Sequence, residues 1–133
     1  MDGYARAGHC KYDLKVHLIF VTKYRKRILI GRVTRDLKAA ITHVSAECGC
    51  KVIQMEADKD HVHILLAYSP SMSISDIVKS LKQYSAAVLW RLHAGLLRKH
   101  YWRGRPLWSD GYFACSIGQA SQAVIERYIR SQG

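Results

Sequence analysis

The sequence predicts an α+β domain built on a mostly antiparallel sheet of four strands. Segments in which apolar and polar residues alternate, the period of a strand, are separated by segments with the spacing of a helix. They follow one another in the order β, α, β, β, α, β, α. The 133 residues are enough for one core but not for two. We therefore expect a single domain over residues 1–133.

The first strand and the first helix are the clearest elements. Residues 13–24 alternate, with Leu14, Val16 and further apolar residues at every second position. Residues 34–48 follow with apolar side chains three or four apart, as on one face of a helix. Gly49 suits the left-handed position that ends a helix.

A hairpin is expected next. Residues 51–57 alternate again, which predicts a strand with Ile53, Met55 and Ala57 on its buried face. The turn at 58–60 is short, so the next strand should pair with this one in antiparallel fashion, although the turn lacks an Asn-Gly or Asp-Gly signature.

The second half of the chain is expected to contain a long helix. Ser73, with Asp76 three residues later, has the spacing of a helix cap. An apolar stripe that ends with Leu92 predicts a helix to about His93. Residues 98–108 are rich in Arg, Lys, Tyr and Trp, and Gly and Pro within them predict a basic, aromatic loop.

A last strand over residues 107–117 and a final helix over 119–132 complete the pattern. Two strand-helix-strand units with one extra helix predict a ferredoxin-like or RRM-like sandwich (β-α-β-β-α-β), a split β-α-β arrangement.

Charge is the strongest signal in the composition. Lys and Arg number 21 against 10 Asp and Glu, a formal charge of +11, which favours a nucleic acid as partner. Residues 23–27 place four cations around one aromatic ring, a pattern suited to phosphates and a stacked base, although a solvated basic turn has the same composition. No apolar run is long enough to span a bilayer and no signal peptide is evident, so we expect a cytoplasmic protein with no membrane partner.

Two histidines mark the third strand. In the run Asp60-His61-Val62-His63, alternation places both imidazoles on one face while Val62 points into the core. Two neutral imidazoles so placed could share a metal ion. The alternative is a pair of polar histidines on the outer face of a half-buried strand.

In the final helix, Tyr128 and Gln132 are four residues apart and so share a face. Alone, this pair favours a core tyrosine and a surface glutamine at the end of the chain over a functional pair.

Taken together, these segments resemble the single-tyrosine HUH transposases, the TnpA-type, IS200-like enzymes of bacterial insertion sequences. The resemblance covers nearly the whole chain, and its specificity lies in the order and spacing of the pieces. They are residues 17–25, 55–56, 60–63, 107–113 and 125–129.

The resemblance implies the following roles. His61, His63 and Gln132 would bind a divalent metal, Mg²⁺ or Mn²⁺, and Tyr128 would attack the scissile phosphate to form a 5′-phosphotyrosine. Rejoining would need no nucleotide cofactor, because the bond energy stays in the phosphotyrosine.

It also implies single-stranded DNA with hairpin ends as the partner and association with the nucleoid during activity. The protein would be a homodimer in which the tyrosine helix of one subunit can complete the histidine site of the other, with the cis or trans arrangement left open. From residue type, we expect DNA contacts from the cations Lys23, Arg25, Lys26, Arg27, Lys79, Lys82, Arg103 and Arg105 and from the aromatic residues Tyr24, Trp102 and Trp108.

Two alternatives stay open. A replication or conjugation nickase shares the histidine pair but carries its nucleophile as Tyr-x-x-Lys, found here only as Tyr12 to Lys15. A non-catalytic or domesticated hairpin-binding protein would bind DNA without needing metal or Tyr128.

Overall fold

The computed structural model describes residues 5–7, 10–116 and 122–132. A 3₁₀ turn, η1, spans Lys23–Arg25. The helices and strands, in chain order, are β1 (Ala5–Ala7), β2 (Cys10–Tyr12), β3 (Leu14–Val21), α1 (Arg32–Glu47), β4 (Lys51–Asp58), β5 (His61–Tyr68), α2 (Ile74–His100), β6 (Phe113–Ser116) and α3 (Gln122–Ser131).

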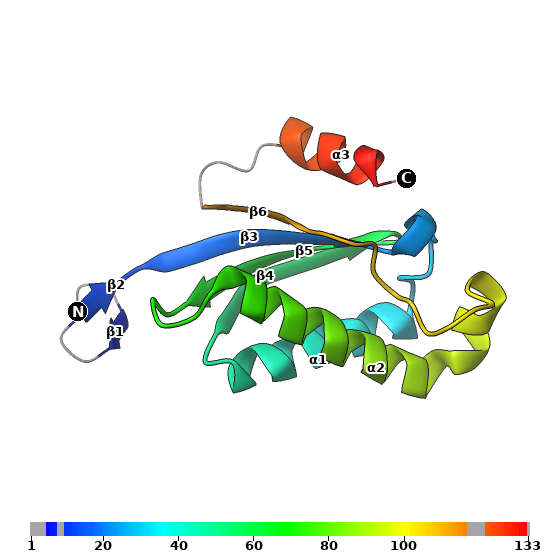
Figure 1. Cartoon of the computed structure of the whole chain (residues 1–133), viewed down its shortest axis with the longest axis horizontal. Coiled ribbons are helices and arrows are strands. Elements are labelled where there is room, and N and C mark those ends of the chain that lie inside the picture. Colours follow the sequence, from blue (N-terminus) through cyan, green and yellow to red (C-terminus); the bar gives the residue numbers. More distant parts are fainter. Residues whose placement is uncertain (1–4, 8–9, 117–121, 133) are drawn as a thin grey trace.

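The main sheet has the strand order β4-β5-β3-β6, and every neighbouring pair is antiparallel. Helices α1 and α2 cover one face, and α3 lies over the other (Figure 1). This confirms the predicted ferredoxin-like sandwich. The short β1–β2 hairpin forms a sheet of its own. Within the described part of the chain, no helix is long and apolar enough to cross a membrane.

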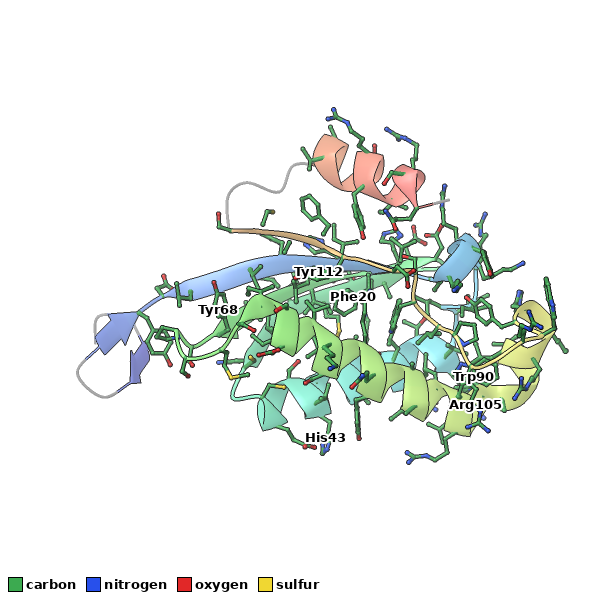
Figure 2. The ribbon with its side chains drawn as sticks, viewed as in Figure 1. Phe20, His43, Tyr68, Trp90, Arg105 and Tyr112 are labelled. Atoms are coloured by element: carbon green, nitrogen blue, oxygen red, sulfur yellow. The ribbon has the colours of Figure 1, made fainter. Side chains whose placement is uncertain are left out.

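The core lies between the sheet and the helices α1 and α2. Alternate residues of β3 and β5 point into it, and Leu18, Phe20 and Ile64 are fully buried there. They pack in one cluster with Leu37 of α1 and Leu81 of α2, and Figure 2 shows Phe20 between the two layers. Because successive residues of a strand face opposite ways, the same alternation sends the histidines to the opposite face.

The predicted buried face of β4 is wrong at one position. The pairing of β4 with β5 shifts between Val52 and Gln54, so an extra residue, Ile53, is inserted in the strand as a bulge. Val52, Met55 and Ala57 pack against the core, whereas Ile53 is 45% exposed. One extra residue moves a side chain to the other face.

The second helix is longer than predicted. It continues past His93, where φ is −131° and ψ is 34°, and ends only at His100. The His93 Nε2 lies 2.7 Å from the Asp36 carboxylate of α1, and this contact accompanies the kink. Just before the kink, Leu92 is 52% exposed, contrary to the prediction, and beyond it Leu97 is buried.

Among the described residues, the last strand is shorter than predicted, because the continuous pairing with β3 covers Phe113–Ser116. Before it, an isolated bridge joins Trp108 to Thr22 at the end of β3. The backbone between the bridge and β6 is held by a side chain. The Lys82 ammonium of α2 donates to the Ser109 carbonyl at 2.9 Å and also to the Gly111 carbonyl. Burial lowers the pKa of Lys82, an effect that the nearby Asp110 carboxylate opposes.

Trp108 belongs to the core. The residue is 8% exposed, and its ring lies edge-to-face with the Phe20 ring, with the two ring centroids 5.6 Å apart. Its Nε1 donates to the Ser85 hydroxyl at 3.0 Å. Neither Trp108 nor Lys82 therefore presents its functional group to a DNA strand, and both act in the fold between α2 and the segment before β6.

We expect Lys82→Met to lower the free energy of unfolding by about 1–3 kcal/mol, because two backbone carbonyls lose their donor. Urea denaturation measures this change. Lys79→Met is the matched control, since Lys79 is exposed on the same helix and should change stability by no more than about 0.5 kcal/mol. Equal stability of the two variants would show that Lys82 does not support this segment.

Candidate metal and DNA-binding site

The two predicted histidine ligands, His61 and His63, lie on the face of the sheet that α3 covers. His61 is paired with Val21 and His63 with Ile19, and residues directly opposite in a sheet share a face. Val21 and Ile19 contact Ile129 of α3 in a small apolar cluster. The β3 residues that pair with the two histidines are therefore the ones that α3 contacts, so the histidines and the final helix lie on the same face of the sheet.

Asp60 orients His61. Its Oδ1 lies 2.9 Å from Nδ1 of His61, and its Oδ2 accepts from Nε of Arg25 at 3.2 Å. Burial alone would raise the pKa of Asp60, but the hydrogen bonds and charges of His61 and Arg25 outweigh it and lower the pKa. Since Nδ1 of His61 is engaged by a carboxylate, Nε2 is left for a metal, the arrangement typical of histidine ligands.

His63 is held neutral. Burial lowers its pKa, and the nearby imidazoles of His17 and His61 act in the same direction against the opposing Glu56 carboxylate. A neutral imidazole has the lone pair that a metal needs. Nε2 of His63 lies 2.8 Å from Nδ1 of His17, a contact that the motif alone did not predict.

His61 opens into a cleft of about 390 Å³ between the β4–β5 turn, the basic turn and α3. Four cations and three carboxylates line it beside His61 and Ile129. They are Arg25, Arg27, Lys59 and Arg130 and, with the opposite charge, Asp58, Asp60 and Glu126. The cleft thus combines an imidazole with an excess of cations, a setting suited to a phosphate.

Tyr128 faces the apolar cluster. Its ring lies 5.6 Å from the Phe113 ring, and its hydroxyl is buried with no hydrogen-bond partner. Burial raises the pKa of the Tyr128 hydroxyl, so the phenol is protonated at neutral pH. The structure therefore brings Tyr128 to the correct face of the sheet but does not bond its hydroxyl to either histidine.

Gln132 follows α3 and lies near the His61 end of the sheet. Its Oε1 accepts from the Ser109 hydroxyl at 3.3 Å, and the Ser109 amide donates to the carbonyl of Val21, the residue paired with His61. Among the described residues, no group of three or more His, Cys, Asp or Glu could hold a metal ion. An amide oxygen, such as that of Gln132, is a further donor type that suits a hard divalent cation.

The basic turn is held in an unusual conformation. Tyr24 (φ 60°) and Arg25 (φ 52°) both adopt left-handed backbone, which is costly for residues other than glycine. Tyr101 stabilises the turn, because its hydroxyl donates to the Lys23 carbonyl at 3.0 Å. This conformation turns the Tyr24 side chain outward, where it is 64% exposed.

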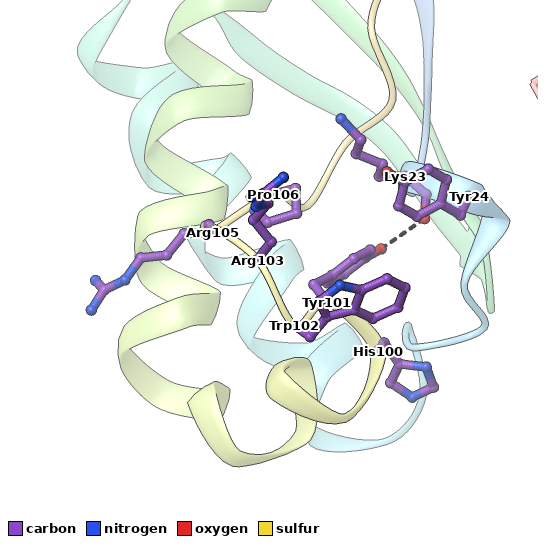
Figure 3. Close-up of a pocket in the computed structure, with 9 residues that line it drawn as sticks. Lys23, Tyr24, His100, Tyr101, Trp102, Arg103, Arg105 and Pro106 are labelled. Atoms are coloured by element: carbon purple, nitrogen blue, oxygen red, sulfur yellow. Dashed lines mark hydrogen bonds between the residues drawn. The ribbon is translucent and has the colours of Figure 1, made fainter.

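The basic turn meets the loop that follows α2 in a second cleft, of about 450 Å³ (Figure 3). Tyr24 and the 84%-exposed Trp102 offer ring faces there, and Lys23 and Arg103 supply charge. Two segments that are far apart in the sequence, both predicted to contact DNA, are therefore adjacent. Arg105 points away from the aromatic rings in Figure 3.

The other predicted DNA contacts are dispersed. Lys79 is exposed on α2, which covers the opposite face of the sheet from α3 (Figure 1). Lys26 lies in the basic turn, and its carbonyl accepts from the Thr22 hydroxyl at 2.8 Å.

Comparison with known proteins identifies the class of the chain as transposases. A family model described as "Transposase IS200 like" matches residues 10–132. The chain belongs to this family. It is 39% identical to the ISDra2 transposase TnpA of Deinococcus radiodurans over 121 residues, which cover 91% of this chain and 85% of the relative. It is 29% identical to the transposase of insertion sequence IS200 from Salmonella typhimurium, over 94% of this chain and 80% of the relative.

Solved structures agree. A crystal structure of a candidate transposase from Deinococcus radiodurans R1 matches with a TM-score of 0.89 and 31% identity, over 96% of this chain and 97% of that one. A REP-associated tyrosine transposase bound to a REP hairpin matches with a TM-score of 0.57 and 12% identity, over 93% and 68% of the two chains. This second likeness concerns the fold alone.

We expect Tyr128→Phe to leave the free energy of unfolding unchanged or to raise it by about 1 kcal/mol, because it removes a buried hydroxyl that has no partner. Chemical denaturation measures the difference. Tyr101→Phe is the control, since its hydroxyl does have a partner and its loss should destabilise the protein. A loss of more than about 1 kcal/mol in Tyr128→Phe would contradict the contacts described for α3.

Proposed function

We propose that this transposase cleaves and rejoins single-stranded DNA at the ends of its insertion sequence, through a 5′-phosphotyrosine formed on Tyr128. The observation that carries the proposal is the shared face of the sheet. His61 and His63 lie on it, His61 lines a cleft rich in cations, and the helix that holds Tyr128 and precedes Gln132 lies over it.

The proposed metal follows from the type of atoms that would bind it. A divalent ion, Mg²⁺ or Mn²⁺, bound by His61, His63 and Gln132 would polarise the scissile phosphate and stabilise its developing charge. Arg25 and Arg27 would contact the flanking phosphates from the wall of the cleft. The Asp60 carboxylate would keep the His61 ring fixed during these events.

Tyr128 supplies the nucleophile in this proposal. Its oxygen forms a bond to phosphorus, the bond from phosphorus to the 3′ oxygen breaks, and the leaving oxygen ends as a 3′ hydroxyl while the phenol loses its proton. Because the hydroxyl is buried against Phe113, α3 has to shift before it can reach a phosphate in the cleft. Rejoining is the reverse attack by a 3′ hydroxyl, so no nucleotide cofactor is required.

The second cleft provides the DNA contacts. Single strands bind proteins through phosphate charges and through bases stacked on aromatic rings, and Tyr24, Trp102, Lys23 and Arg103 offer both. The REP-associated relative is bound to a hairpin. We extend this to a hairpin at the ends of the element, bound by a homodimer in which the tyrosine helix of one subunit can also serve the histidine site of the other.

The position of Tyr12 argues against the nickase alternative. Tyr12 ends β2, just before Leu14, which is paired with Tyr68 at the end of β5 opposite His61. A nucleophile has to lie within reach of the phosphate held at the metal site. Tyr128, on the helix that covers the histidine face, is far better placed.

We expect the protein, incubated with Mn²⁺ and single-stranded DNA carrying the ends of its element, to form a denaturation-resistant adduct. Tyr128→Phe should abolish the adduct, and a chelator or His61→Ala should reduce it by at least about 10²-fold. Denaturing electrophoresis of labelled DNA provides the measurement.

Tyr12→Phe is the control for this experiment and should form the adduct normally. Adduct loss in Tyr12→Phe but not in Tyr128→Phe would favour the nickase. Tight hairpin binding without any adduct, with or without metal, would instead favour a non-catalytic binding protein.

We expect Trp102→Ala to weaken binding of single-stranded DNA by about 1–3 kcal/mol, because one stacking surface is lost. Fluorescence anisotropy with a labelled oligonucleotide, at fixed salt concentration, measures the affinity. Leu92→Ala is the control, since Leu92 is also an exposed apolar residue, 52% exposed on α2, that does not line this cleft, and it should bind as the wild type does. Unchanged binding by Trp102→Ala would show that this cleft does not bind the single-stranded DNA.

A further inference from the structure

A third imidazole lies beside the predicted metal pair. Nδ1 of His17, on β3, lies 2.8 Å from Nε2 of His63, and the two ring centroids are 5.0 Å apart. This distance is that of a hydrogen bond between ring nitrogens, in which one ring donates and the other accepts. His17 is outside the histidine motif, and the proposed mechanism assigns it no role.

The register of the sheet fixes the side of His63 on which His17 lies. His17 is paired with Leu65, whereas His61 and His63 are paired with Val21 and Ile19. Along β5 the order is therefore His61, His63 and then Leu65, which lies opposite His17 of β3. His17 contacts His63 from the side opposite His61.

The two nitrogens of one imidazole direct their bonds to nearly opposite sides of the ring. Since Nε2 of His63 is directed at His17, Nδ1 on the other side of the ring is directed away from it. His61 has the complementary pattern, because its Nδ1 is engaged by Asp60 and its Nε2 is left over. Each histidine of the pair thus has one nitrogen engaged by a neighbour and one available.

Surroundings separate His17 from the DNA cleft. It lines a small pocket of about 50 Å³ with His63, Gln54, Glu56 and Leu65, whereas the cleft beside His61 is lined by other residues. A side chain in such a pocket can act on its neighbour but is poorly placed to bind a phosphate. Its chemical role is therefore exerted through His63.

We propose that His17 is a positioning residue for the metal site, accepting a hydrogen bond at Nδ1 from the Nε2–H of His63 and thereby leaving the Nδ1 lone pair of His63 free for the divalent ion. This inference rests on the proposed function, because it takes His61 and His63 as metal ligands. Partners of this kind fix both the tautomer and the orientation of a ligating ring.

The tautomer of His63 is the first test, and it requires no metal. Long-range ¹H–¹⁵N NMR spectra of the metal-free, full-length protein should identify His63 as the Nε2–H tautomer. His17→Leu should convert it to a mixture of tautomers, and His17→Asn, whose amide oxygen can take the place of Nδ1, should restore the single form. An Nδ1–H tautomer of His63 in the wild type would overturn the inference and leave the proposed function intact.

Metal affinity is the second test, with Mn²⁺ as the probe in calorimetric or electron paramagnetic resonance titrations. His17→Leu should bind Mn²⁺ about 10–100-fold more weakly, and His17→Asn within a few-fold of the wild type. His43→Leu, which removes an exposed imidazole from α1, should bind normally.

Unchanged or tighter Mn²⁺ binding by His17→Leu would overturn the positioning role. Wild-type affinity in His61→Ala, or no Mn²⁺ binding by the wild type, would overturn the metal assignment of the proposed function and this inference with it.

Discussion

Asp60 connects the two functional regions of the molecule. One carboxylate oxygen lies against His61, and the other accepts from Arg25 in the basic turn. Its backbone carbonyl accepts from the Thr22 amide at 2.9 Å and from the Thr22 hydroxyl at 3.2 Å, which joins the end of β3 to the start of β5. The residue that orients a metal ligand therefore also anchors the segment expected to contact DNA. A displacement of the basic turn (residues 23–27) would therefore shift Asp60 and, through it, the His61 ring.

The sheet divides structural from chemical roles by simple alternation. The apolar positions of β3 and β5 form the core with α1 and α2, so packing on this face of the sheet holds the two strands in place. The intervening positions carry His17, His61 and His63 on the face that α3 covers, and among the described residues α3 contacts this face through a small apolar cluster. Rigid strands can hold the proposed metal ligands in fixed positions. The proposed function requires, in addition, that the helix with Tyr128 moves.

Local pattern accounts for most of what the sequence predicts correctly. The order of the main elements along the chain, the face shared by His61 and His63, and the left-handed Gly49 (φ 73°) after α1 all follow from periodicity or backbone preference. The missed features depend on contacts between distant segments. Ile53 is turned outward by a bulge in the pairing with β5, and Trp108 and Lys82 are drawn inward by partners 23 to 29 residues away. His17 lies in the first predicted strand but outside the histidine motif, and only the register with β5 brings it to His63.

The burial of Tyr128 has an energetic consequence for α3. A buried hydroxyl without a partner costs about 1–3 kcal/mol, so the docked position of the helix is less stable than its apolar contacts alone would make it. A phenol with a raised pKa is also a poor nucleophile, which limits attack while the helix is docked. Displacement of the helix toward a bound phosphate would relieve the first penalty and lower the pKa as the hydroxyl leaves its apolar surroundings. Binding of DNA and activation of Tyr128 would then be coupled by the same movement.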